Sequence, residues 1–197
     1  MGINDQVKKE CSEATRRKVA AVFLDRDGVL NRAVVREGRP YPPRSVEELE
    51  ILPGVAQALK ALRGAGYRLI VITNQPDVAR GAATIAEVEA INRALGDILP
   101  IDEFRTCYHD NFDGCDCRKP LPGALHGAAL AHDIDLTRSY MVGDRWRDVE
   151  AGRAAGCVTF FVDYGYAERQ PSNPDFCVKS LLDAALIILK GCDYATA

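Results

Sequence analysis

Residues 19–31 constrain the fold more than any other segment, because an uninterrupted apolar run leads straight into two aspartates. A short apolar run of this kind is typical of a strand that is covered on both faces. Asp25 and Asp27 follow the run, and Gly28 then lets the backbone turn sharply and approach a ligand closely. We therefore expect both carboxylates at the carboxyl end of a buried strand, where open α/β sheets bind their ligands.

The two carboxylates need a positive partner, because negative charges close together in a buried position are unfavourable. A divalent cation meets this need. Magnesium typically binds one or two protein carboxylates and fills the rest of its shell with water and substrate phosphates. The DxDG segment therefore predicts a Mg²⁺ site.

Apolar runs and amphipathic segments alternate along the chain, which is typical of an α/β fold with a doubly wound parallel sheet. The Pro-rich segment 32–52 has no clear period and is too short for a large cap domain, so we expect a loop or flap there. We expect an N-terminal extension at 1–18 and one domain at 19–191. The patterns predict strands at 19–24, 67–72, 104–108, 139–142, 157–162 and 176–178, and helices at 53–63, 84–99, 123–132, 147–155 and 181–189.

The composition, with 47% hydrophobic and 27% charged residues, indicates a soluble globular protein. A net charge of −3 gives no broad attraction to nucleic acid or to an anionic membrane. The longest apolar run, 184–189, is too short to span a bilayer, and residues 1–18 lack the apolar core of a signal peptide. Seven cysteines, an odd number, favour a reducing compartment. We therefore expect a cytoplasmic protein with no nucleic-acid partner and no membrane partner.

Polar side chains also follow the other expected strands. Thr73 and Asn74 end the second strand, Lys119 lies in the loop after the third, and Asp144 ends the fourth. Asp148 comes one helical turn after Asp144. Parallel strands bring such ends to one edge of the sheet. Together with the DxDG aspartates, these residues supply a nucleophile, an acid–base group, a cation and metal ligands, which is the set that phosphoryl transfer needs.

Each of these motifs alone has a simpler explanation. A DxD pair is often a turn, and Gly-Asp before a helix is often an N-cap. A different class, the receiver domain of signalling proteins, also gathers Asp, Thr and Lys on a parallel sheet. Its phosphoacceptor aspartate follows the third strand, whereas Asp25 follows the first, and Thr73 precedes Lys119 here. The order of the motifs therefore favours an enzyme.

DxDG, a threonine after the second strand, a Lys-Pro pair and GDxxxD, in this order, resemble the motifs of the haloacid dehalogenase (HAD) superfamily of phosphatases. The resemblance implies that Asp25 attacks phosphorus and forms an aspartyl-phosphate, while Asp27 acts as acid and then as base. It implies that Asp25, the backbone carbonyl of Asp27 and Asp144 bind Mg²⁺. It also implies that Thr73 and Lys119 hold the transferring phosphoryl oxygens.

A group of potential metal ligands lies between the third strand and the Lys-Pro pair. Three thiolates and one imidazole within eleven residues suit a closed, tetrahedral, structural Zn²⁺ site. A chance cluster of small buried thiols and a redox switch are the alternatives. Such a site would fix the loop that carries Arg118 and Lys119. The expected ligands are Cys107, His109, Cys115 and Cys117.

This zinc loop, together with FLDRDGVLN, TNQ and CRKP, resembles a subgroup of the superfamily that hydrolyses heptose bisphosphate or histidinol phosphate. The length and single-domain form look most like the heptose enzymes, which implies a monomer that removes the C7 phosphate of a small sugar bisphosphate. The resemblance also gives Asp148 a supporting position behind the lysine or the metal. The candidate substrate-binding residues are Arg26, Asn31, Asn74, Arg118 and Arg145.

The chain departs from this subgroup at positions that we expect to border the substrate. Pro76-Asp77 follows TNQ, and a bulky Arg145-Trp146-Arg147 segment follows Gly-Asp. Histidinol phosphate and a 3′-phosphorylated DNA end therefore remain alternative substrates. The acidic balance and the zinc loop count against DNA.

Overall fold

A computed structural model describes residues 18–191, so most of the expected N-terminal extension lies outside the described residues. Its centre is a six-stranded sheet with the order β5-β4-β1-β6-β7-β8, in which every neighbouring pair is parallel. The doubly wound α/β fold predicted from the sequence is confirmed. The strands are β1 (Ala21–Leu24), β4 (Arg68–Asn74), β5 (Glu103–Cys107), β6 (Tyr140–Gly143), β7 (Val158–Val162) and β8 (Phe176–Val178).

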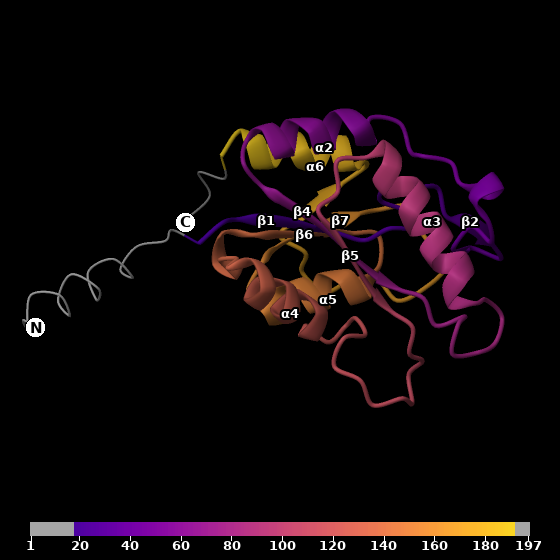
Figure 1. Cartoon of the computed structure of the whole chain (residues 1–197). Helices are drawn as coiled ribbons and strands as arrows, with labels where there is room; N and C mark the ends of the chain where they lie inside the picture. Colours follow the sequence, from indigo (N-terminus) through magenta and orange to yellow (C-terminus); the bar gives the residue numbers. More distant parts are fainter. Residues whose placement is uncertain (1–17, 192–197) are drawn as a thin grey trace, which may run out of the picture.

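Helices cover both faces of the sheet (Figure 1). The helices α2 (Val55–Gly64), α3 (Ile85–Ile98) and α6 (Leu181–Leu189) pack on one face, and α4 (Gly123–His132) and α5 (Trp146–Ala155) pack on the other. Residues 18–191 also contain two short 3₁₀ helices, η1 (Val46–Glu48) and η2 (Leu136–Arg138). No helix within residues 18–191 is long and apolar enough to cross a membrane.

Strand β1 shows why its sequence is apolar without interruption. Val22 and Leu24 belong to the core under α2, α3 and α6, whereas Ala21 and Phe23 belong to the core under α4 and α5. Successive side chains of a strand point to opposite faces, so a strand between two cores needs apolar residues at every position. This central strand carries Asp25 and Asp27 at its carboxyl end.

The flap is more regular than its sequence suggests. Strands β2 (Val34–Arg36) and β3 (Arg39–Tyr41) form an antiparallel hairpin. Its central residues, Glu37 and Gly38, both have positive φ, as a type I′ turn requires. Pro40 within β3 weakens the strand signal, because proline cannot donate to a ladder and is confined to edges. The loop or flap expected here thus contains a regular hairpin that the sequence did not indicate, and no large cap lies between β1 and α2.

Candidate active site

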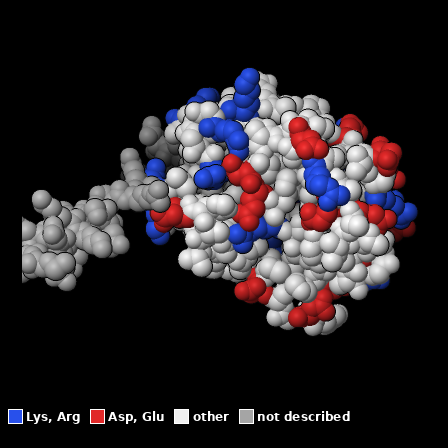
Figure 2. Space-filling model, viewed as in Figure 1, with Lys and Arg blue, Asp and Glu red and all other residues white. Residues whose placement is uncertain are grey.

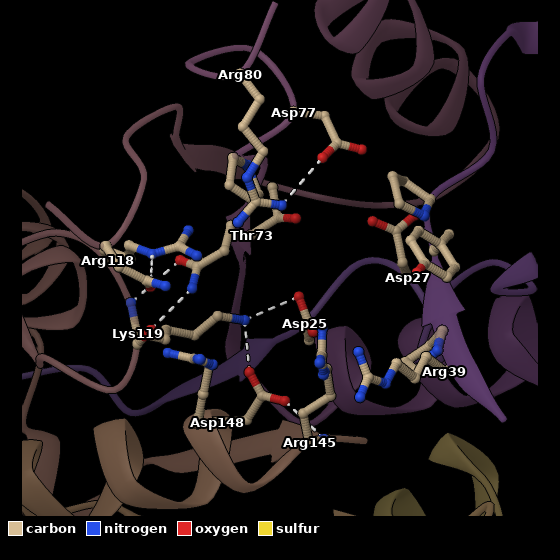
Figure 3. Close-up of a pocket in the computed structure, with 17 residues that line it drawn as sticks. Asp25, Asp27, Arg39, Thr73, Asp77, Arg80, Arg118, Lys119, Arg145 and Asp148 are labelled. Atoms are coloured by element: carbon tan, nitrogen blue, oxygen red, sulfur yellow. Dashed lines mark hydrogen bonds and ion pairs between the residues drawn. The ribbon is translucent and has the colours of Figure 1, made fainter. Parts of the chain in front are cut away.

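The polar residues that end the central strands meet at one edge of the sheet, where a cavity of about 250 Å³ opens (Figure 3). Asp25 and Asp27 come from β1, Thr73 from β4, Lys119 from the loop after β5, and Asp148 from α5. Pro40 and Tyr41 of the flap also line the cavity. The cavity lies just below the size range of typical ligand pockets, roughly 300–1,000 Å³, so it suits a small metabolite.

Lys119 is the centre of the polar cluster. Its side chain is only 2% exposed, and its ammonium group donates to Asp25 Oδ1 at 2.8 Å, Asp148 Oδ1 at 2.6 Å and the Ile72 carbonyl at 2.6 Å. Burial lowers the pKa of Lys119, but the charges of Asp148 and Asp25 outweigh this effect and the pKa is raised overall. Lys119 is therefore a fixed positive charge at the floor of the cavity (Figure 3).

Only one carboxylate oxygen of Asp25, Oδ1, accepts hydrogen bonds from the described residues. Its Oδ1 accepts from Lys119 and, at 2.8 Å, from the backbone N–H of Arg26. Burial and the nearby charge of Asp148 raise the pKa of Asp25 to about 6, against the opposing effect of Lys119. Oδ2 accepts no hydrogen bond from the described residues, so it is the oxygen available for nucleophilic attack.

Asp148 is a structural link between the lysine and helix α5. While its Oδ1 binds Lys119, its Oδ2 accepts from the backbone N–H of Arg145 at 2.9 Å and so caps the start of α5. Gly143 makes this arrangement possible, because a Cβ at that position would lie 2.1 Å from the Cβ of Asp148.

Asp144 carries the least satisfied charge among the described residues of the site. It is 1% exposed, and neither carboxylate oxygen has a hydrogen-bond partner in residues 18–191. Burial and the charges of Asp25 and Asp148 raise its pKa well above the ordinary value, against a smaller lowering by the nearby Tyr166 hydroxyl and by Arg145. Oxygens of Asp25, Asp144 and Asp148 lie within 4.8 Å of one another. A buried carboxylate without donors, beside two others, fits a hard divalent cation such as Mg²⁺.

Gly28 permits the close approach of β1 to Asp144. Its φ is +86°, and a Cβ at this position would lie 1.9 Å from Asp144 Oδ2. Any side chain here would therefore displace the carboxylate.

Asp27 is oriented by several side-chain donors. Arg26 donates from Nη2 at 3.0 Å, Asn31 from Nδ2 at 3.0 Å and Gln75 from Nε2 at 2.9 Å. Arg26 and Asn31 are fully buried and do not line the cavity, which corrects the expectation that they face the substrate. Arg26 is held from behind by Asn92, whose Oδ1 accepts from Nη1 at 2.9 Å.

Gln75 was missed as a site residue, although it is the last residue of the TNQ motif. Its amide donates to both Asp27 and the Thr73 hydroxyl, the latter at 2.8 Å. Asn74 lines the cavity, but its amide exchanges two hydrogen bonds with the backbone of Lys119, at 2.9 and 3.1 Å. Asn74 therefore positions the lysine, and its polar atoms are not free for a substrate as expected.

The four expected zinc ligands lie together at the end of β5 and in the loop that follows it. The Sγ of Cys107 lies 3.6 Å from His109 Nδ1 and 3.8 Å from Cys115 Sγ, and Cys117 Sγ lies 3.5 Å from His109 Nδ1. Tetrahedral zinc with ordinary bond lengths separates two sulfurs by about 3.8 Å and a sulfur from a nitrogen by about 3.6 Å. Burial and the neighbouring thiols raise the pKa of Cys117 to about 12, and a bound cation would reverse that shift.

The arginines at the rim of the cavity differ in their partners. Arg118 donates to the His109 carbonyl at 3.0 Å and to Asn111 Oδ1 at 3.1 Å, so it also braces the loop of the cysteine cluster. Arg145 forms a two-pronged ion pair with Glu168, which the sequence did not reveal. Both line the cavity, and their contact with a substrate stays a prediction.

Comparison with known proteins agrees with the motifs. Residues 116–184 match the family model described as HAD-hydrolase-like. The D-glycero-D-manno-heptose-1,7-bisphosphate 7-phosphatase of Thermosynechococcus vestitus is 36% identical over 83% of this chain and 92% of its own length. The D-glycero-beta-D-manno-heptose-1,7-bisphosphate 7-phosphatase of Escherichia coli is 37% identical over 73% of this chain and 78% of its own.

A solved structure of a heptose-bisphosphate phosphatase is also similar to this chain. The D,D-heptose 1,7-bisphosphate phosphatase of B. bronchiseptica, crystallised with magnesium and phosphate, superimposes with a TM-score of 0.71 at 32% identity. The match covers 87% of this chain and 99% of that one. On the strength of this identity across nearly the whole length of its relatives, the chain belongs to the HAD-like hydrolases, in the family of the heptose-bisphosphate phosphatases.

Proposed function

We propose that the protein is a magnesium-dependent phosphatase that removes the C7 phosphate of D-glycero-D-manno-heptose 1,7-bisphosphate through an aspartyl-phosphate at Asp25. The observation that carries this proposal is the buried cluster in which Lys119 bridges Asp25 and Asp148 beside the unpaired carboxylate of Asp144. Such a cluster binds one cation and one phosphoryl group, and neutralising charge is the main task in phosphoryl transfer.

The first chemical step uses both aspartates of the DxDG motif. Oδ2 of Asp25 attacks phosphorus as the bond to the sugar oxygen breaks, and Asp27 gives its proton to that oxygen. Lys119 and the Thr73 hydroxyl stabilise the phosphoryl oxygens. Arg26, Asn31 and Gln75 hold Asp27 in position for this transfer.

In the second step water attacks the phosphorus of the aspartyl-phosphate, and Asp27 accepts a proton from that water. The P–O bond to Asp25 then breaks, which releases inorganic phosphate, restores the Asp25 carboxylate and leaves Asp27 protonated for the next cycle. Asp25, Asp144 and the Asp27 backbone carbonyl would hold Mg²⁺, which supplies charge neutralisation when bound. Cys107, His109, Cys115 and Cys117 would hold a structural Zn²⁺.

The substrate assignment rests on the relatives named above and on the size of the cavity. Positive and negative side chains are interspersed on the face of the protein in Figure 2, where a DNA-binding enzyme would carry a broad basic surface. We further propose that the protein works in the cytoplasm as a monomer.

The test is phosphate release with and without Mg²⁺ from three substrates: the heptose 1,7-bisphosphate, histidinol phosphate and a 3′-phosphorylated DNA end. We expect Mg²⁺-dependent release of one phosphate per heptose bisphosphate, with the C1 phosphate retained in the ³¹P spectrum of the product. Equal or better turnover of histidinol phosphate or DNA would overturn the substrate. No Mg²⁺-dependent release from any of the three would overturn the activity.

A further inference from the structure

The arginines that line the cavity differ in whether a carboxylate already neutralises them. Arg80 pairs with Asp110 at 2.7 Å, Arg118 approaches the same carboxylate at 3.6 Å, and Arg145 pairs with Glu168. Arg147 also lines the cavity and is half-buried, yet no carboxylate in residues 18–191 forms an ion pair with it. A partly buried guanidinium without a counter-ion is a ready site for an anion.

The surroundings of Arg147 increase its demand for negative charge. It lies in the first turn of α5, where the helix dipole favours anions over cations. Burial and the like charges of Arg118 and Arg145 lower the pKa of Arg147, and the charges of Glu168 and Asp148 offset this lowering only in part. A positive charge at this position is disfavoured by the α5 dipole and by the neighbouring arginines, and such unfavourable placements are expected at functional sites.

A stacking contact fixes the arginine in place. The guanidinium carbon of Arg147 lies 4.5 Å from the centre of the Trp146 ring, and that of Arg169 lies 4.2 Å from the same ring. Arg169 is in turn tied to Glu150 by an ion pair. Arg39 of the flap also lines the cavity without a carboxylate partner among the described residues, but no such contact holds it. Trp146 therefore presents Arg147 at low entropic cost.

We propose that Arg147, stacked on Trp146 and next to Arg118, binds the phosphate of the substrate that is not hydrolysed and so selects bisphosphates over monophosphates. This inference rests on the proposed function, because it requires a substrate with two phosphates. It assigns a specificity role to the bulky Arg145-Trp146-Arg147 segment that distinguishes this chain from the pattern expected for its subgroup. Arg147 would supply the planar fork for this phosphate, and Arg118, whose guanidinium also braces the cysteine loop, would add positive charge.

The test compares kcat/KM for heptose 1,7-bisphosphate with kcat/KM for heptose 7-phosphate in the wild type and in Arg147→Met. We expect this ratio to fall by roughly 10- to 100-fold in the variant, the effect of a lost charged hydrogen bond. The loss should come mainly through KM of the bisphosphate. Arg147→Lys should restore part of the ratio. The matched control is Arg93→Met, which changes an exposed arginine on α3 that does not line the cavity.

Trp146 gives a second readout, because it is the only tryptophan in the chain. Titration of the inactive Asp25→Asn protein with heptose 1,7-bisphosphate should change its fluorescence, and adding Arg147→Met should weaken the apparent affinity at least tenfold. An unchanged ratio and an unchanged affinity in a folded Arg147→Met protein would overturn the inference alone. A wild type that does not prefer the bisphosphate would overturn both the inference and the proposed substrate.

Discussion

Replacing Asp144 with asparagine should make the metal-free protein more stable. In the absence of a cation the carboxylate is buried with no formed hydrogen bond from residues 18–191, although the Tyr166 hydroxyl is nearby, and it lies beside Asp25 and Asp148. An unsatisfied buried acceptor costs about 1–3 kcal/mol, and more if it is charged. For a domain of this size 1 kcal/mol corresponds to roughly 3 °C in Tm. We therefore expect Asp144→Asn to raise the Tm in EDTA by roughly 3–9 °C at pH 8.

The pH dependence of this gain has a defined sign. The folded-state pKa of Asp144 lies well above the ordinary value of 3.8, so the folded protein binds a proton more tightly than the unfolded chain. The penalty is absent well below pH 3.8, grows as pH rises from about 3.8 to the raised folded-state pKa, and is constant above that pKa. The advantage of the variant should shrink accordingly on acidification.

Magnesium should stabilise the wild type selectively and so cancel most or all of the stability advantage of the variant. A cation at 100 times its Kd stabilises the wild type by about 2.7 kcal/mol, or roughly 8 °C, and should not stabilise the variant. Scanning calorimetry in EDTA and in Mg²⁺ measures both effects, with Asp97→Asn on the exposed face of α3 as the control. The account of Asp144 fails if the variant is less stable than wild type in EDTA at pH 8, or if Mg²⁺ stabilises both equally.

Three further changes test other parts of the site. Cys115→Ser should reduce bound zinc from about one per chain to near zero by elemental analysis and lower the Tm, whereas the exposed Cys177→Ser should do neither. Gln75→Leu should lower kcat by roughly tenfold, because Asp27 loses a donor at 2.9 Å, and an unchanged kcat would contradict that role. Gly143→Ala should lower the Tm by roughly 3–9 °C, since the new methyl group would overlap a buried side chain, and a Tm within 1 °C of wild type would contradict the clash.

The sheet and its helices were predictable because their signals are local. Continuous apolar runs marked the strands, and the helix expected at 84–99 is present as α3, which starts with a full capping box between Thr84 and Glu87. The flap hairpin was not predictable, because Pro40 masks one of its strands and a two-stranded ribbon carries no core pattern.

The site residues that lie at or near the carboxyl ends of the parallel strands were predictable, because such ends meet at one edge of the sheet. Asp25, Lys119 and Asp148 come together as the motif order indicated. The roles of Arg26 and Asn31 could not be predicted, because a motif gives the spacing of residues but not the direction in which each side chain points. The ion pair between Arg145 and Glu168 joins distant parts of the chain and leaves no local sequence signal.

The central claim is that Asp25 accepts the phosphoryl group, and beryllium fluoride tests it most directly. This anion forms a tetrahedral adduct on a carboxylate that resembles an aspartyl-phosphate, so it does not depend on the intermediate accumulating. The account predicts Mg²⁺-dependent ¹⁹F signals of bound fluoride in the wild type and none in Asp25→Asn. Bound signals that persist in folded Asp25→Asn, or their absence from an active wild type, would contradict the assignment of the nucleophile.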